Sequence, residues 1–489
     1  MVAYLSDNPT AKAFSKKKGN VDIVRIAPFD CGVLVEFRVG EKVRPRLKLI
    51  ISRVDSREKV CEQVMYYKFD TRTVLQTGLT NGVDYIAELI VCDEDLNELA
   101  RSNARLFRCG YFPGKIIDYI HPDDETFMES GEFVGSPQII KTSSARYLAC
   151  HDVFCHDGSL GHGCLCRFFV SYDGENWSFL SEIPRCTWGT VFEIKGRIYI
   201  VGTNIQIVDS GIQNRMDLVL YYSDDYGASW SEPVVLKKST SDTGYRATPT
   251  AYAIHNNRIW IEHGVQTNSR NGIAVLSACT DDDLTLKESW TDSEPVYYDS
   301  SWEGVVPEWN GIMFEEGNVV ITPEGELKIF ERFNSHPYGT KLINPDMVRT
   351  AVLKINTENP AKPPEFEKTV PFSAGMHKFY IVRDEENSRY LALGNRMTID
   401  NVSQRNILSL YSSEDLEKWT VERDLINLED VEWYEPYGKY GYQYPTFILE
   451  NGEILAVVRT ALNGADNFHN SNAMTFHRFK NIKDKYTKR

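Results

Sequence analysis

Residues 171–177 read Ser-Tyr-Asp-Gly-Glu-Asn-Trp, and residues 223–230 read Ser-Asp-Asp-Tyr-Gly-Ala-Ser-Trp. The two tryptophans are 53 residues apart, and weaker copies of the pattern follow at 280–290 and 412–419. Each copy follows an apolar run typical of a β-strand, and each repeat opens with two more such runs. A period of about 50 residues with about four strands per unit predicts the blades of a β-propeller.

Six repeat units are expected, with starts near residues 132, 185, 245, 312, 375 and 441. The sixth unit is one strand short. The run Lys-Ile-Ile-Asp-Tyr-Ile at 115–120 is a candidate for the missing strand and would close the ring. The fold class expected is therefore all-β, a six-bladed β-propeller preceded by a small β-sandwich.

The N-terminal part has a different pattern, with short alternating strands across residues 20–110 and no repeat. This pattern predicts a separate β-sandwich. The expected organisation is an N-terminal extension at 1–19, the sandwich at 20–110, a linker with the ring-closing strand at 111–131, and the propeller at 132–489.

The composition excludes several kinds of partner. A formal net charge of −15, from 69 acidic and 54 basic side chains, argues against a nucleic-acid or anionic-membrane surface. Aromatic residues make up 12% of the chain, which favours strands and sugar-stacking surfaces. No apolar run reaches 18 residues, so no transmembrane helix is expected.

The cysteines and the first residues bear on the compartment. Residues 1–20 lack the apolar segment of a secretory signal. The ten cysteines are therefore expected to be reduced, mostly buried thiols of a cytoplasmic protein. Several histidines and cysteines cluster at 151–166, but Cys164-x-Cys166 is not the spacing of a zinc knuckle. Neither a metal nor a cofactor is expected.

The Ser-x-Asp-x-Gly-x-x-Trp pattern resembles the Asp box of the sialidase superfamily, and the resemblance covers roughly residues 130–480. The box is structural in that family, so its residues here are evidence of fold and not catalytic candidates. The motifs Glu-Glu-Gly-Asn (315–318) and Met-His-Lys-Phe (376–379) resemble a sparsely characterised branch of sialidase-like propellers. Residues 79–85, Leu-Thr-Asn-Gly-Val-Asp-Tyr, resemble the tyrosine corner of fibronectin type III domains.

The resemblance implies a set of catalytic residues. In sialidases a Glu opens the inner strand of the fourth blade and polarises a nucleophilic Tyr, and an Arg on the partner strand grips the substrate carboxylate. Glu316 and Arg332, 16 residues apart, match these two positions. Arg405 matches a further carboxylate-binding Arg. Tyr444 is the preferred match for the nucleophile, and Tyr442 is the alternative.

The first unit departs from the family. Sialidases begin it with Phe-Arg-Ile-Pro, whereas residues 133–137 here read Phe-Val-Gly-Ser-Pro. One carboxylate-binding Arg is therefore missing, which puts sialic acid itself in doubt as the substrate. The general acid of the family lies in the next loop, where Asp152, Asp157 and His162 are the candidates here. The unperturbed pKa of His suits proton transfer near neutral pH.

Other residues are expected near the pocket because they begin or flank inner strands. They are Arg246, His377, Lys378, His469 and Asn472.

The function expected is that of a sialidase-like glycoside hydrolase acting on a terminal, anionic sugar of an oligosaccharide. Two alternatives stay open. One is a polysaccharide lyase that cleaves beside a uronic acid with His and Tyr chemistry. The other is a carbohydrate-binding propeller without turnover. The oligomeric state is not predicted.

Overall fold

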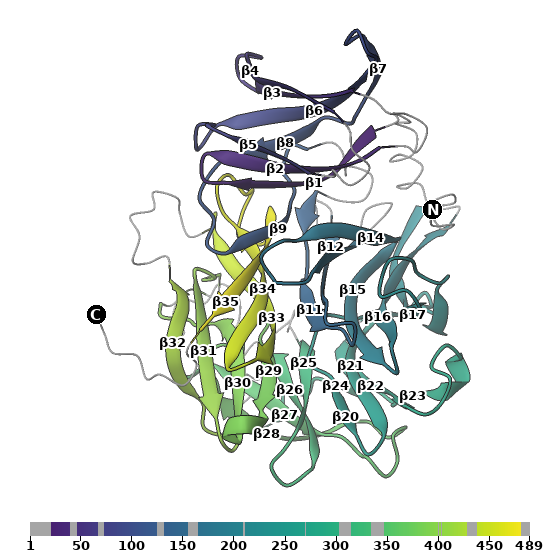
Figure 1. The fold of residues 1–489 in the computed structure, drawn as a ribbon. Coiled ribbons are helices and arrows are strands. Elements are labelled where there is room, and N and C mark those ends of the chain that lie inside the picture. The colour runs from purple at the N-terminus through teal and green to yellow at the C-terminus, as the bar shows by residue number, and fades with distance from the viewer. Residues whose placement is uncertain are drawn as a thin grey trace.

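The computed structural model describes residues 21–39, 46–66, 73–124, 132–154, 165–208, 211–268, 270–302, 314–333, 347–399, 401, 403–427 and 438–480, without the side chains of 205–208 and 211–214. This part of the chain is built of β-strands with short 3-10 helices η3 (Lys287–Ser289) and η5 (Glu385–Asn387). A small β-sandwich lies against a ring of six antiparallel sheets (Figure 1). The expected all-β fold class is confirmed.

The N-terminal sandwich consists of two antiparallel sheets, one with strand order β1-β2-β5 and one with order β4-β3-β6-β7, in which β8 also pairs with β6. In β3, buried residues alternate with half-buried ones, so one face of the sheet covers the apolar core. The hydroxyl of Tyr85 accepts the backbone N–H of Thr80 at 3.0 Å, which fixes the turn before β6. The strands of this domain are β1 (Val21–Phe29), β2 (Gly32–Val39), β3 (Arg46–Arg53), β4 (Lys59–Tyr66), β5 (Thr73–Thr77), β6 (Asp84–Cys92), β7 (Glu98–Arg101) and β8 (Arg105–Arg108).

The six sheets of the ring are the blades of a propeller, and their starts agree with the repeat units in the sequence. In blades 2, 4 and 5 four strands follow one another in chain order. Blades 1 and 3 carry short additional strands, β11, β20 and β24. The strands of blades 1 to 3 are β10 (Phe133–Val134), β11 (Gln138–Lys141), β12 (Tyr147–Phe154), β13 (Leu165–Ser171) and β14 (Ser178–Pro184); β15 (Cys186–Ile194), β16 (Arg197–Val208), β17 (Gly211–Ser223) and β18 (Val234–Lys237); and β19 (Thr243–Arg246), β20 (Ala253–His255), β21 (Arg258–Thr267), β22 (Asn271–Cys279), β23 (Trp290–Asp292) and β24 (Val296–Tyr297).

The last blade is completed by a strand from before the ring. Its order is β33-β34-β35-β9, with Ala473 opposite Tyr119 and Met474 opposite Asp118. An edge strand that pairs with its own chain in this way leaves no open blade at the seam. The strands of blades 4 to 6 are β25 (Phe314–Ile321), β26 (Leu327–Phe333), β27 (Arg349–Lys354) and β28 (Glu365–Pro371); β29 (Tyr380–Asp384), β30 (Arg389–Asn395), β31 (Ile407–Ser413) and β32 (Thr420–Asn427); and β33 (Gly441–Glu450), β34 (Glu453–Ala461), β35 (Ala473–Phe479) and β9 (Lys115–Tyr119).

Neighbouring blades are joined around the axis by hydrogen bonds between their inner strands. Asn318 of blade 4 links two neighbours at once, because its carbonyl oxygen accepts from Ala251 and Ile381 and its amide donates to Phe379. The other links are Gln138 to Val191 (blades 1 and 2), Thr190 to Thr248 (blades 2 and 3), Asn395 to Tyr442 (blades 5 and 6) and Ile139 to Thr446 (blades 1 and 6). Every adjacent pair of blades is therefore tied by at least one buried polar contact.

The Asp boxes form the turns that the sequence predicts. In the first box the Ser171 hydroxyl accepts the N–H of Gly174 at 2.9 Å, and Asp173 accepts the N–H of Asn176 at 2.8 Å. Trp177 is buried and donates to the carbonyl of Gly174. The boxes at Ser223 and Ser413 repeat the contacts of the Ser hydroxyl and the Asp carboxylate with the backbone. The box thus closes the hairpin between the third and fourth strands of a blade.

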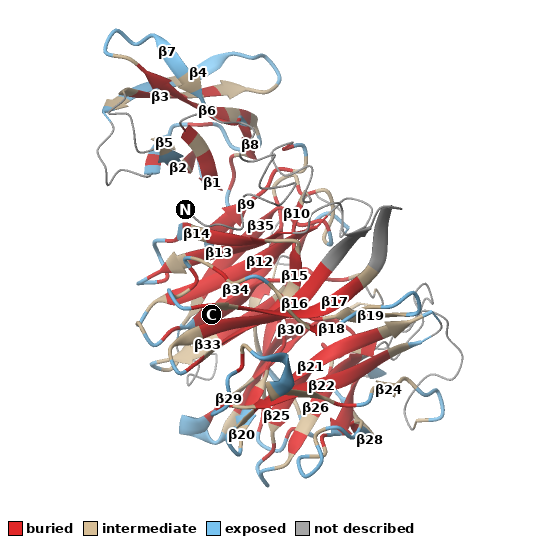
Figure 2. Cartoon of the chain, turned by 90° about the vertical axis from the view of Figure 1, so that its right-hand side faces the viewer, coloured by how far each residue is buried: buried red, intermediate tan, exposed pale blue. Residues whose placement is uncertain are grey.

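The sandwich and the propeller share a buried charged interface. Arg25 of β1 donates to the carbonyl of Ile116 at 3.0 Å, and Arg167 of blade 1 donates to Val24 at 2.6 Å. Arg167 also pairs with Asp118 of the closing strand at 3.0 Å. These groups are almost fully buried, and Figure 2 colours much of β1, β9 and β13 as buried. Loss of either partner would leave an uncompensated buried charge, so the domain contact and the ring closure depend on each other.

No disulfide joins the eight cysteines in the described ranges. Among the described residues, no helix has the length and apolar character needed to cross a bilayer.

Asp225 tests the Asp box. Partial burial alone raises the pKa of its carboxyl, but hydrogen bonds from Ser229 and Ser223 outweigh this and lower it. Asp225→Ala should lower the free energy of unfolding by about 1–2 kcal/mol, the usual cost of losing a capping carboxylate. Because the folded-state pKa is lowered, this difference from wild type should be present at neutral pH and shrink as the pH falls below about 4. Denaturant unfolding at several pH values measures it.

Asp224→Ala is the matched control for this variant, since Asp224 makes only an exposed ion pair with Arg197 among the contacts found for it. It should cost less than about 1 kcal/mol. Equal losses in the two variants would contradict the structural role of the box.

Asn318 tests the links between blades. Asn318→Ala leaves the N–H groups of Ala251 and Ile381 and the carbonyl of Phe379 without this partner in a buried place. Each buried unpaired group costs about 1–3 kcal/mol, so the variant should unfold at least about 3 kcal/mol more easily. Thermal or denaturant unfolding measures this. Asn356→Ala, which removes one exposed turn contact, is the control, and a loss no larger than the control's would refute the role.

Candidate active site

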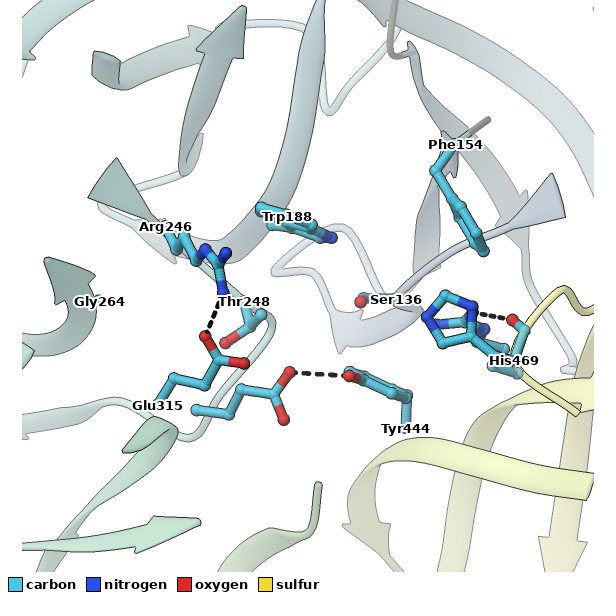
Figure 3. Close-up of a pocket in the computed structure, with 11 residues that line it drawn as sticks. Ser136, Phe154, Trp188, Arg246, Thr248, Gly264, Glu315, Tyr444 and His469 are labelled. Atoms are coloured by element: carbon cyan, nitrogen blue, oxygen red, sulfur yellow. Dashed lines mark hydrogen bonds and ion pairs between the residues drawn. The ribbon is translucent and has the colours of Figure 1, made fainter. Parts of the chain in front are cut away.

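A pocket of about 230 Å³ lies at the ends of inner strands from five of the six blades. Its polar residues come from blades far apart in the sequence and face one another across the cavity (Figure 3). A site of this kind forms only when the ring closes. The lining residues are Ser136, Phe154, Trp188, Arg246, Thr248, Gly264, Glu315, Glu316, Tyr444, Arg459 and His469.

Three inner strands share one local distortion that places a side chain in the pocket. In β15, β25 and β33 three steps of the strand lie opposite two steps of its partner, which is a β-bulge. The bulges contain Trp188, Glu316 and Tyr444, whose φ angles are 48°, 72° and 54°. Left-handed backbone at such residues costs about 1–3 kcal/mol and is typical of functional sites. In the sequence, each bulge is marked by the residue that follows, which is Gly189, Gly317 or Pro445.

Glu316, Arg332 and Tyr444 form one hydrogen-bonded group. The Tyr444 hydroxyl donates to Glu316 Oε1 at 2.9 Å, and Arg332 Nη1 donates to Glu316 Oε2 and lies 3.3 Å from the Tyr444 oxygen. Burial, followed by the negative charge of Glu316, raises the pKa of Tyr444. Tyr444 is therefore a neutral phenol that donates its proton to a carboxylate. Arg332 is close enough to the Tyr444 oxygen to stabilise negative charge on it.

A second ion pair lies on the other side of the cavity. Arg246 Nη1 donates to Glu315 Oε2 at 2.8 Å, and its guanidinium lies 5.9 Å from the Trp188 ring centroid. Trp188 is half-buried and presents an aromatic surface across the cavity from the Tyr444–Glu316 pair (Figure 3). Aromatic faces of this kind bind the apolar face of a sugar ring.

Arg459 is the cation that sequence reasoning did not assign to the site, although it stands on the strand after Tyr444. Its guanidinium lies between the rings of Phe154 and Tyr444, at 4.8 and 5.1 Å from their centroids. It donates to the His469 carbonyl, and its Nε has no hydrogen-bond partner within the described residues. A buried guanidinium with an unused donor in a pocket is suited to a carboxylate ligand.

His469 lies beside Arg459 at the mouth of the pocket. Its ring packs edge-on against Phe154 and its Nδ1 lies 2.9 Å from the side-chain oxygen of Asn470. The residue is exposed, yet its ring is enclosed by these neighbours, and desolvation followed by the charge of Arg459 lowers its pKa to about 4. The imidazole is therefore neutral at pH 7.

Lys378, His377 and Arg405 lie behind the pocket and not on its surface in the described part of the chain. Burial, followed by the charge of Arg332, lowers the pKa of Lys378 to about 7, and its Nζ donates to the carbonyl of Pro445 at 3.4 Å. His377 Nδ1 faces the carbonyl of Asn395, so it carries the proton, and Nε2 accepts from Arg405 at 2.8 Å. These residues support the pocket wall.

The space beside Gly135 is filled by a carboxylate. A side chain at Gly135 would begin 2.4 Å from the carboxyl of Asp152. Asp152 is buried, accepts from the N–H of Ser136 at 2.6 Å and from the Thr187 hydroxyl at 3.1 Å, and burial raises its pKa. It therefore lies beneath the pocket surface. The other acid candidates, Asp157 and His162, lie outside the described residues.

Two expected site residues are structural instead. Tyr442 is fully buried in an apolar cluster, and its hydroxyl has no partner within the described residues. Asn472 is also buried, and its side chain ties the turn after β34 through Leu462. In a regular strand Tyr442 and Tyr444 would face the same side, because the period is two residues. The bulge that contains Tyr444 breaks this alternation, so Tyr444 faces the pocket and Tyr442 stays in the core.

No group of three or more His, Cys, Asp or Glu side chains is placed to hold a metal ion in the ranges that the structure describes. The histidine and cysteine cluster at 155–164 lies outside them.

Comparisons with known proteins bear on the fold. No protein-family model and no curated protein matches the sequence. The NanB sialidase from Streptococcus pneumoniae matches at 9% identity over 94% of this chain and 93% of that chain, with a TM-score of 0.50. The intramolecular trans-sialidase from Ruminococcus gnavus matches at 12% identity over 76% of this chain and 98% of that chain, with a TM-score of 0.49. The chain thus has the all-β propeller fold of the NanB sialidase.

Proposed function

We propose that the protein is a glycoside hydrolase acting on a terminal, anionic sugar of an oligosaccharide. The observation that carries the proposal is the 2.9 Å hydrogen bond from Tyr444 to Glu316 at the wall of an axial pocket, with Arg332 beside both. A nucleophile and base within hydrogen-bond reach, oriented by a third group, are the signature of covalent catalysis. The pocket is small enough to favour a single terminal sugar residue over the middle of a polymer.

In the first step the Tyr444 oxygen attacks the anomeric carbon while its proton passes to Glu316. The bond from that carbon to the leaving oxygen breaks, and the leaving oxygen takes a proton from an acid. In the second step water, deprotonated by that acid's conjugate base, attacks the anomeric carbon, and Glu316 returns its proton to the departing Tyr444. A neutral phenol approaches an anionic sugar without the repulsion that a carboxylate nucleophile would meet.

The acid is assigned to the 151–162 loop, with Asp157 or His162 as the donor. Asp152 is a poorer donor because Ser136 and Thr187 already bind its oxygens below the surface. Its contacts suit the role of holding the loop that starts the first blade.

The substrate anion is assigned to Arg459, with Arg246 on the opposite side and Trp188 and Phe154 as apolar walls. This arrangement differs from the sialidase pattern, in which an Arg would stand at Gly135. We therefore propose a carboxylated sugar, with a uronic acid as the first candidate ahead of sialic acid.

The N-terminal sandwich is proposed to be fibronectin type III-like. The three-stranded and five-stranded antiparallel sheets and the Tyr85 contact to Thr80 support this. Such a module serves as a spacer or a docking unit.

The proposal is tested by incubating the protein with uronic-acid and sialic-acid oligosaccharides while reducing ends and ultraviolet absorbance are followed together. Hydrolysis produces reducing ends alone. A second candidate, elimination by a lyase, is favoured by one observation, the neutral His469 in the same pocket as Tyr444. Elimination adds an ultraviolet-absorbing product. Binding without either signal would support a carbohydrate-binding propeller instead.

Glu316→Gln should lower kcat by about 10²–10⁴-fold, because the amide cannot take the Tyr444 proton. The melting temperature should also fall, because the buried Arg332 guanidinium loses its counter-charge, so the rate is compared at a temperature at which both proteins are folded. Glu324→Gln, on an exposed turn of the same blade, is the control and should keep the wild-type rate. A Glu316→Gln enzyme as fast as wild type would refute the assigned role.

Arg459→Met should lower kcat/KM for a uronic-acid glycoside by about 10–100-fold more than for the matching neutral hexose glycoside, because a charge-assisted hydrogen bond is lost only with the anion. The same leaving group on both substrates makes the ratio the measurement. A general disturbance of the His469 loop would lower both rates equally and would count against the anion-binding role.

A further inference from the structure

Resting on the proposed function, we infer that Glu262 and Glu331 are positioning residues that hold the strained Glu316 bulge while they are protonated, and that their ionisation turns the activity down as the pH rises. Neither residue lines the pocket among the described residues, and neither belongs to the group formed by Glu316, Arg332 and Tyr444.

The two carboxyls meet at one residue, Gly317, directly after Glu316. Glu262 Oε2 accepts the N–H of Gly317 at 3.1 Å, which is the backbone donor that the bulge frees from the strand ladder. Glu331 presses on the other side, where a Cβ on Gly317 would lie 2.3 Å from Glu331 Oε2. Only glycine fits between them, so their position and that of the bulge are locked together.

Both side chains are buried, and neither forms an ion pair within the described residues. Glu262 and Glu331 are 1% and 0% exposed. Oε1 of Glu262 and both carboxyl oxygens of Glu331 have no hydrogen-bond partner in the described part of the chain. A buried, unpaired carboxylate is strongly disfavoured, so the neutral acid is the stable form.

The surrounding charges add to this effect. Around Glu331, the negative charges of Glu262, Glu315 and Glu316 raise its pKa. The positive charge of Arg332 lowers the pKa of Glu331, but Arg332 is already bound to Glu316. Arg246 on β19 is bound to Glu315. Burial first, and then the negative neighbours, raise the pKa of both Glu262 and Glu331 well above the ordinary carboxyl range.

Ionisation of either residue therefore places a new negative charge beside the peptide that aims Glu316 at Tyr444. The bulge is already strained, and the Gly317 N–H bond to Glu262 Oε2 does not offset the repulsion between the new charge and the Glu316 carboxylate. Glu316 then moves away from Tyr444, and the base is lost. The result is a reversible loss of kcat at higher pH.

The test compares pH profiles of kcat for wild type and Glu331→Gln, whose amide keeps the volume and does not ionise. The alkaline limb of the variant should move to higher pH by at least one unit. Lys378 and Tyr444 also titrate on the alkaline side, but they do so in both proteins, so the difference reports Glu331. Glu262→Gln, which can still accept the Gly317 N–H, should shift the limb in the same direction if the first variant folds poorly. Glu324→Gln should leave the profile unchanged.

Melting temperature against pH gives a readout that needs no activity. Because the folded-state pKa of Glu331 is raised, its stabilising effect is complete below the ordinary Glu value of about 4.3 and is lost as the pH rises towards the folded-state value. Wild type should therefore lose melting temperature relative to Glu331→Gln across that range. Coincident kcat limbs and parallel melting curves would overturn the inference. If wild type is inactive but the two melting curves diverge, the proposed function is refuted, while the claim that Glu331 is protonated in the folded protein still holds.

Discussion

The structure depends on the circle of hydrogen bonds that joins the inner strands of the blades. The side chain of Asn318, in blade 4, hydrogen-bonds to both blade 3 and blade 5. Thr446 joins blade 6 to blade 1 beside the seam closed by β9. These contacts have defined geometry and lie between strands of different blades, so they set how the inner strands lie against one another. The circle fixes the distance across the axis, and with it every contact that spans the pocket.

This rigidity explains how the chain keeps three residues in left-handed backbone. Trp188, Glu316 and Tyr444 sit in bulges of alternate blades, and the neighbouring blades hold the strands on both sides. At these three positions the left-handed backbone turns a side chain out of the sheet and towards the axis. The same logic joins the site to the carboxyls of Glu262 and Glu331, which stand behind one bulge. The most reactive part of the molecule is thus the part whose backbone is least relaxed.

Charge is distributed very unevenly in this acidic protein. The net charge of −15 excludes a polyanion lying across the surface, but the pocket gathers the guanidiniums of Arg246 and Arg459 with Arg332 behind them. Arg246 and Arg332 are paired with Glu315 and Glu316, whereas Arg459 has no carboxylate partner among the ion pairs of the described residues. Beside Gly135 the carboxyl of Asp152 fills the space that a longer side chain would need.

The amino-acid sequence was enough to predict the repeated blades and several candidate catalytic residues. The Asp boxes predict the blades because a capped turn needs Ser, Asp and Trp at fixed spacing, whereas Glu316, Arg332 and Tyr444 were proposed as a group only through the resemblance to sialidases. Arg459, Trp188 and the burial of Tyr442 were beyond prediction, because a one-residue bulge reverses which side chains face the axis. The pocket brings together residues up to 333 positions apart, from Ser136 to His469. Local sequence determines what each strand is, and only the closed ring decides which side chains meet.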